Sequence, residues 1–167
     1  LIMIQVSVRF DRSPLDVGDS AILKLRYEDT ALFQEGAILS SPEGVRVQTH
    51  PLRISSANEV NWRVKALEEG VHEMAILLPQ GQVNKTVSVG RDAREISPMR
   101  VSGGLFERLI YPVEEGLPDH WGIDYIKVEY PAVEYSLFGL HLHWIVIFFV
   151  VSIATGFALK RAFGVEV

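Results

Sequence analysis

Short runs in which apolar and polar residues alternate recur between residues 17 and 133. In the run Val60–Lys65 the even-numbered residues are apolar and the odd-numbered ones polar, so one face of a strand would be buried. Such alternation is typical of half-buried β-strands. It predicts strands at Ala21–Tyr27, at the run that begins with Val45, and at Val60–Lys65, Val71–Leu78, Val83–Val89 and Tyr125–Tyr130.

The spacing of these strands predicts a mainly β fold. Each strand has one apolar face, which needs a second apolar layer, so we expect an immunoglobulin-like antiparallel β-sandwich over residues 17–133. Leu67–Gly70 resembles a corner at which the chain crosses between sheets. A short amphipathic helix is expected near residues 104–111, before Pro112, where it would cap the sandwich or lie on a bilayer surface.

The most apolar segment lies near the C-terminus. Leu137–Leu159 contains no charged residue and its apolar positions form no helical stripe. A helix of this length spans roughly 34 Å, enough for a hydrocarbon core of ~30 Å. We therefore expect a single transmembrane helix at residues 137–160, with a buried core helix or a pair of strands as the alternative. The expected anchors at the membrane interfaces are His143, Trp144, Lys160 and Arg161.

The positive-inside rule sets the expected orientation. Lys160 and Arg161 would hold the tail, residues 161–167, in the cytoplasm of a bacterium. The helix would then cross the inner membrane, and the β-domain would lie in the periplasm. Export of that domain requires either a signal peptide that has been removed or an earlier membrane helix. The lead-in, residues 1–16, fits a strand by its alternation and equally fits the end of such a helix.

Composition narrows the classes of function. The 167 residues include 16 basic and 21 acidic ones, which gives a net charge of −5. A nucleic-acid binder usually has a basic face, so nucleic acid is not an expected partner. Cysteine is absent, which excludes disulfides, thiol catalysis and cysteine-ligated metal sites. The expected partners are the lipid bilayer and other membrane protein subunits.

Candidate chemistry is sparse. His141 and His143 could together hold a metal on a strand, but on a helix they would point about 200° apart. A membrane histidine could also bind a pigment. Because a helix is expected there, we interpret them as interfacial histidines and expect no cofactor and no metal site. The pairs Glu68–Glu69 and Glu114–Glu115 are interpreted as solvated turn charges. No motif places a nucleophile, so we expect no catalytic residue and a non-enzymatic protein.

Small residues in the apolar segment suggest a helix partner. Ser152, Thr155 and Gly156 would let a second helix approach closely. Small residues are also common in membrane helices that have no partner, so this alternative stays open.

Both edges of the chain carry a recognisable pattern of short motifs. These are Pro14-Leu15, Gly18-Asp19, Tyr130-Pro131 and Gly156–Val167. In these motifs the chain resembles an uncharacterised family of bacterial integral membrane proteins, in which a β-domain outside the cytoplasm is followed by one last helix. Some members of that family are distantly similar to Oxa/YidC-like insertases. The resemblance implies that the chain is the C-terminal part of a longer membrane protein with further helices before the β-domain.

These observations lead to two expectations for function. The first is a non-enzymatic, membrane-anchored β-sandwich that acts as an accessory or assembly subunit of a larger membrane complex, such as a photosynthetic or respiratory one. The alternative is the extracytoplasmic domain and last helix of a multi-span insertase- or transport-like protein.

Overall fold

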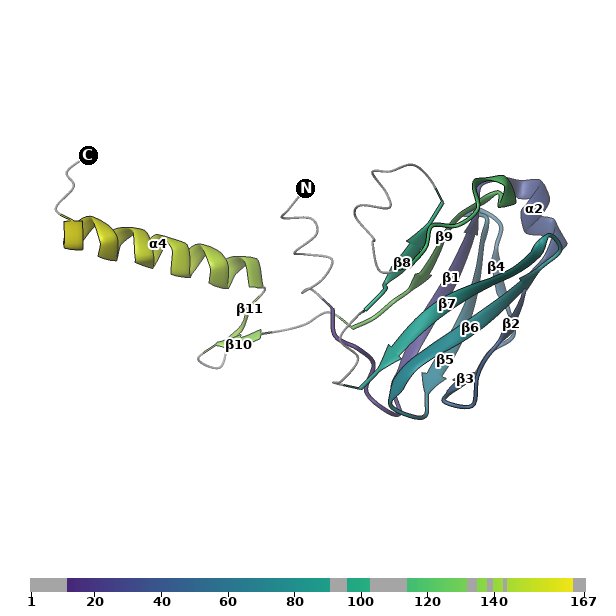
Figure 1. Cartoon of the computed structure of the whole chain (residues 1–167), viewed down its shortest axis with the longest axis horizontal. Helices are drawn as coiled ribbons and strands as arrows, with labels where there is room; N and C mark the ends of the chain where they lie inside the picture. The colour runs from purple at the N-terminus through teal and green to yellow at the C-terminus, as the bar shows by residue number, and fades with distance from the viewer. Residues whose placement is uncertain are drawn as a thin grey trace. The chain divides into compact units, whose positions relative to one another are not determined.

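The computed structural model describes residues 12–90, 96–102, 114–131, 135–137, 140–142 and 144–163. The chain forms two compact units, Leu1–Pro131 and Ala132–Val167, each of which is described by itself (Figure 1). Two expected segments lie outside the described residues, namely most of the lead-in and the short helix near residues 104–111.

The first unit contains two antiparallel sheets (Figure 1). The larger sheet has the order β3 (Val45–Val47), β5 (Glu59–Ala66), β1 (Ser20–Tyr27), β9 (Ile123–Val128) and β8 (Met99–Val101), and β4 (Leu52–Ile54) also pairs with β5. The smaller sheet has the order β2 (Ile38–Ser40), β6 (Gly70–Leu78) and β7 (Gly81–Val89). Two short helices complete the unit, α2 (Thr30–Glu35) and the 3₁₀ helix η1 (Asp119–Trp121).

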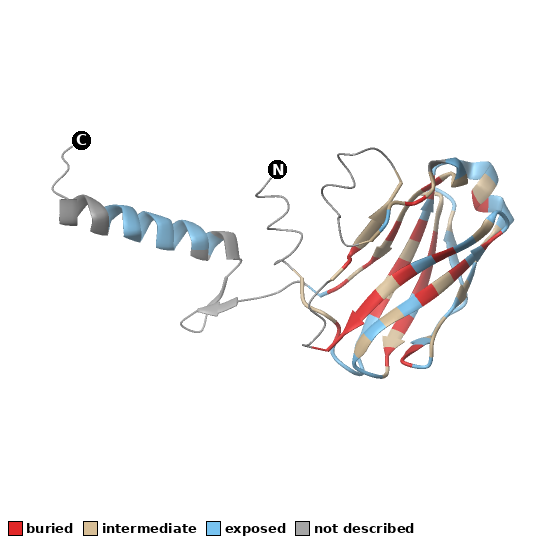
Figure 2. Cartoon of the chain, in the orientation of Figure 1, coloured by how far each residue is buried: buried red, intermediate tan, exposed pale blue. Residues whose placement is uncertain are grey.

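Alternation of the side chains places the core between the sheets. On β5 the even-numbered residues are buried, as predicted, and Arg63 on the opposite face is exposed. The inward residues of β1 and β6 follow the same period of two, which Figure 2 shows as alternating bands. Burial of these apolar side chains is the main stabilising contribution to the sandwich.

The six predicted strands are all present, and the fold is mainly β with antiparallel sheets. The corner at Leu67–Gly70 is confirmed, since it joins β5 of the larger sheet to β6 of the smaller one. Strands β2, β4 and β8 were not predicted. Each has three residues, which leaves little alternation to recognise. Strand β3 is equally short, but its run was predicted because Val45 and Val47 alternate with Arg46.

The sandwich begins earlier than residue 17. Leu15, which the sequence assigned to the lead-in, forms a parallel bridge with Val89 of β7. Its amide donates to the carbonyl of Ser88 at 3.1 Å, and its carbonyl accepts from the amide of Gly90 at 2.8 Å. The side chain is 1% exposed and belongs to the core. The boundary expected at residue 17 is therefore wrong, because one isolated leucine gives no periodic signal.

Leu15→Ala is expected to lower the free energy of unfolding by about 2–5 kcal/mol, because it removes buried methyl groups and leaves a cavity. Val17→Ala is the control, since Val17 is 51% exposed and its truncation should change stability by less than about 0.5 kcal/mol. Urea unfolding of both variants measures the difference. Equal stabilities would show that Leu15 is not part of the core.

The second unit consists of a hairpin and a helix. Strands β10 (Tyr135–Leu137) and β11 (Leu140–Leu142) pair with each other, and α4 runs over Trp144–Phe163. The helix thus begins at Trp144 and not at Leu137, so the expected start is wrong. The sequence places Gly139 in the stretch expected to be helical, and glycine disfavours a helix interior by about 1 kcal/mol relative to alanine.

Candidate functional site

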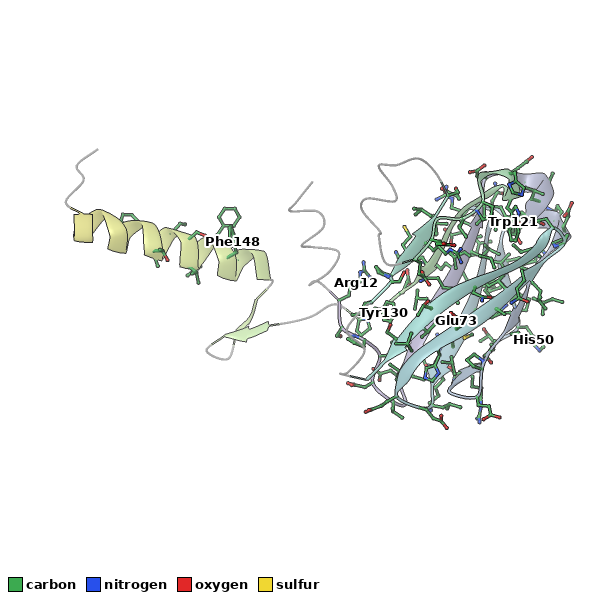
Figure 3. The ribbon with its side chains drawn as sticks, viewed as in Figure 1. Arg12, His50, Glu73, Trp121, Tyr130 and Phe148 are labelled. Atoms are coloured by element: carbon green, nitrogen blue, oxygen red, sulfur yellow. The ribbon has the colours of Figure 1, made fainter. Side chains whose placement is uncertain are left out.

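The surface of α4 is apolar. Every residue of this helix whose burial is described is exposed, including Ser152, Thr155 and Gly156. Figure 2 shows this exposure along the described part of the helix, and Phe148 projects from it in Figure 3. The exposed large apolar residues are Val146, Phe148, Phe149, Val150, Val151, Ile153 and Phe157. Exposed apolar surfaces of this kind are typical of sites that contact lipid or another protein.

The structure describes the expected membrane-interface residues and the two histidines only in part. Trp144, Lys160 and Arg161 lie within α4, and their side chains are outside the described residues. His141 lies in β11 opposite Ser136, so its expected helical setting is wrong, and His143 is outside the described residues.

Among the residues that the structure places, no three His, Cys, Asp or Glu gather as a metal site. In the same part of the chain, no helix has the length and apolar character needed to cross a membrane.

A buried ion pair ties β7 to the segment that follows β8. The ammonium of Lys85 lies 2.5 Å from the Glu114 carboxylate, and the two side chains are 0% and 12% exposed. Lys85 also donates to the Ser97 carbonyl at 2.7 Å. The second carboxylate oxygen of Glu114 accepts the backbone amide of Thr86 at 2.7 Å. This arrangement corrects the interpretation of Glu114 as a solvated turn charge.

In this pair, each charge stabilises the charged form of the other group. Burial raises the pKa of Glu114, but the nearby charge of Lys85 and the hydrogen bonds from Lys85, Ser97 and Thr86 outweigh burial, so the pKa lies below its usual value. Burial lowers the pKa of Lys85, which the Glu114 carboxylate opposes. The Ser97 hydroxyl is 2% exposed and donates to Glu114. The geometry is that of a structural ion pair, since Lys85 is held by the carboxylate that neutralises it.

The free edge of β7 is covered by side chains over most of its length. Besides the bond from Thr86 to Glu114, the amide of Ser88 donates to the Tyr130 hydroxyl at 2.9 Å. The carbonyl of Asn84 accepts from the Arg100 guanidinium at 2.6 Å. An open strand edge is a template for pairing with another chain. These contacts close that template from Asn84 towards the end of β7.

A hollow of about 250 Å³ lies beside the start of the same strand, lined by Gln82, Val83, Asn84, Arg100, Pro118 and Trp121. Ligand sites for drug-sized molecules are usually about 300–1,000 Å³, so this one suits a smaller group. Trp121 lies toward the opposite end of the sandwich from Tyr130 (Figure 3).

The outer faces of the two sheets carry different exposed cross-strand pairs. On the smaller sheet, Ile38 of β2 and Leu77 of β6 are cross-strand partners and are 67% and 43% exposed. On the larger sheet, Arg46 of β3 faces Lys65 of β5 directly. Like charges in directly opposite positions are destabilising. The outer face of the larger sheet thus carries a repulsive pair that folding alone does not favour.

Arg46→Gln is expected to raise the free energy of unfolding by about 0.2–1 kcal/mol at low salt, because it removes this repulsion. Salt screens charges at an exposed site, so the gain should shrink in concentrated sodium chloride. Denaturant unfolding at two salt concentrations measures it. Unchanged or lower stability at low salt would contradict the repulsion.

Sequence reasoning missed the ion pair, although one signal was present. Lys85 stands between Val83 and Val87 on the inward face of a predicted strand. A charge at such a position needs a buried partner, but no rule of spacing indicates Glu114, 29 residues away. The hollow gave no signal, since its walls come from separate segments that only the fold brings together.

Comparisons with known proteins give no relatives for this chain: no protein-family model matches it, and neither the curated proteins nor the solved structures contain a match.

Proposed function

We propose that this chain is a membrane-anchored, non-enzymatic β-sandwich that works as an accessory or assembly subunit of a larger membrane protein complex. The observation that carries the proposal is the exposed apolar surface of α4. Water is an unfavourable surrounding for such a surface, whereas a bilayer or a neighbouring membrane helix is favourable. The uncharged run Leu137–Leu159 of the sequence also supports the anchor.

The order of strands supports a binding domain of immunoglobulin type. In that fold one sheet has the strand order A-B-E-D and the other C-F-G. The orders β1-β5-β3 and β2-β6-β7 correspond to B-E-D and C-F-G, whereas β9 takes the place of strand A although it comes last in the chain. Such sandwiches serve many functions, so the fold does not by itself select one.

Two apolar features support contact with other subunits. The exposed pair Ile38–Leu77 lies on the outer face of the smaller sheet, where a partner would cover it. On α4, no atom of the described residues, apart from the nearby backbone of the helix itself, lies within 4 Å of the position that a Cβ at Gly156 would occupy. A small residue with open space beside it permits close approach of a second helix.

Extraction of membranes at alkaline pH tests the anchor. The chain should remain in the membrane pellet, whereas the double variant Val151→Arg/Ile153→Arg should be released. Each arginine near the middle of a span costs about 2.5–3.5 kcal/mol. The matched control is Val151→Leu/Ile153→Leu, which keeps the surface apolar and should stay in the pellet. Release of the unmodified chain would contradict the anchor.

Labelling of single cysteines tests the orientation, because the chain has no cysteine of its own. Gln82→Cys on β7 should react with a membrane-impermeant maleimide in spheroplasts, and Glu166→Cys in the tail should react only after lysis. This pattern follows from the positive charges of Lys160 and Arg161. The reverse pattern would place the sandwich in the cytoplasm.

A second candidate is the extracytoplasmic domain of a multi-span insertase- or transport-like protein. It is favoured by the amide of Ser13, which donates to the carbonyl of Pro131 at 3.1 Å and so brings both ends of the sandwich to one place. A domain inserted between two membrane segments would need this geometry. Native mass spectrometry from mild detergent separates the candidates. A complex with other chains supports the subunit, and a lone chain far heavier than 18.7 kDa supports the multi-span protein.

A further inference from the structure

We infer that the hollow beside the start of β7 binds the C-terminal carboxylate of a short extended peptide. The inference goes beyond the proposed function, since it concerns a ligand site on the sandwich and does not depend on where α4 lies. It rests on three observations: an open piece of strand edge, a fixed arginine that pairs with no carboxylate among the described residues, and an aromatic wall.

The open edge is a short part of β7. Alternate residues of a strand direct their backbone groups to opposite sides. Thr86 and Ser88 use theirs on the side away from β6, so Gln82 and Asn84 present theirs on that side too. Of the backbone groups that Gln82 and Asn84 present on this side, only the carbonyl of Asn84 has a hydrogen-bond partner among the described residues, namely Arg100. The amides of Gln82 and Asn84 therefore face the hollow as hydrogen-bond donors.

Arg100 supplies the charge. Its side chain is held by two backbone carbonyls, that of Glu115 at 2.6 Å from Nε and that of Asn84 at 2.6 Å from Nη1. No described carboxylate lies within 4.0 Å of its guanidinium. A cation that is already fixed in place loses little conformational freedom when it binds an anion. Guanidinium groups and carboxylates form strong, charge-assisted hydrogen bonds.

Trp121 closes the other end of the hollow. Its ring lies over Gly81, where a side chain would come within 3.0 Å of it. Its carbonyl accepts from the side chain of Gln80 at 2.9 Å, which fixes η1 against the hairpin between β6 and β7. Pro118 and Val83 add apolar surface. The hollow thus offers an apolar wall at one end and a cation at the other.

These features together select the ligand class. Strand addition at a sheet edge recognises extended peptides through their backbone, and a chain terminus is recognised through its carboxylate. The small volume limits the peptide to its last few residues. Because Arg100 and Trp121 bound the hollow at both ends, a long strand passing through the site fits less well than a chain terminus does.

Peptide titration followed by NMR tests the inference with the full chain in mild detergent. The probe is trialanine with a free C-terminus, and the signal is the indole N–H of Trp121, identified by its absence in Trp121→Phe. The free acid should shift this signal saturably in the micromolar to millimolar range. The same peptide with an amidated C-terminus should bind at least about 10-fold more weakly, since it lacks the charge that pairs with Arg100.

Two variants keep the test decisive. Arg100→Gln should weaken binding of the free acid about 10-fold or more, whereas Arg63→Gln, at an exposed arginine on β5 that does not line the hollow, should not change it. If Arg100→Gln disturbs the fold, as an altered Trp62 indole signal would show, Gln82→Pro removes one edge donor and leaves the arginine in place. Equal binding of acid and amide, or no saturable shift with either, would overturn the inference.

Discussion

Glu114→Ala is expected to lower the free energy of unfolding by about 3–5 kcal/mol, which is a large part of the stability of a single domain. The substitution leaves the Lys85 ammonium buried without its neutralising charge. It also removes the acceptor of the Thr86 amide on the edge of β7. Chemical denaturation followed by circular dichroism measures the loss. A cost below about 1 kcal/mol would show that the pair is solvated and not buried.

The double variant Lys85→Met/Glu114→Leu is the matched control. Apolar residues of similar volume often replace a buried ion pair without loss, so it should be clearly more stable than Glu114→Ala. If the double variant instead loses as much stability as the single variants Lys85→Met and Glu114→Leu lose together, the two residues do not act as a pair.

The same pair predicts a dependence of stability on pH. Because the pKa of Glu114 is lowered in the folded chain, the unfolded chain takes up a proton first as pH falls. The ionised Glu114 carboxylate therefore contributes its full stabilisation above the ordinary carboxyl pKa of 4.5. This stabilisation is lost as pH falls below that value towards the pKa of Glu114 in the folded chain. The chain should lose stability more steeply below pH 4.5 than the double variant does. Parallel profiles for the two proteins would contradict this assignment.

Trp62→Ala is the second change with a large expected effect, about 3–5 kcal/mol of lost stability. Trp62 lies on β5 in the larger sheet, is 2% exposed and faces Leu23 of β1 across the strand pair. Its removal leaves one of the largest cavities that a single substitution can make in this core. Thermal unfolding measures the effect as a lowered Tm.

Arg63→Ala is the control for Trp62→Ala, since it changes the next residue of the same strand. Its side chain is exposed on the outer face, so the expected change lies within about 0.5 kcal/mol. If both variants lose similar stability, the inward and outward faces of β5 have been assigned wrongly.

The sequence allowed much of the sandwich to be predicted because long strands with one buried face carry their own periodic signal. Strands β1, β5, β6, β7 and β9 show this, and so does the corner at Leu67–Gly70. Features held by a few tertiary contacts carry no such signal. Leu15 joins the core through a single bridge, and the hairpin before α4 replaced the expected start of a helix.

The candidate sites were less predictable, for a related reason. The apolar character of α4 belongs to one segment and was recognised directly. Lys85 and Glu114 form an ion pair although they are 29 residues apart in the sequence. Arg100 is held beside the hollow by hydrogen bonds to the carbonyls of Glu115 and Asn84. Neither set of contacts follows from local spacing in the sequence. The inward place of Lys85 on its strand was the one clue, and it shows that a partner is needed without showing which residue provides it.

The contact between Ser13 and Pro131 has a practical consequence for protein engineering. One hydrogen bond joins the positions at which the backbone enters and leaves the sandwich. A cassette cut at these positions could replace a tight turn in a host protein without forcing the flanking segments apart. Transplantation into an exposed loop would then let the sandwich be produced, selected and displayed apart from its own apolar helix.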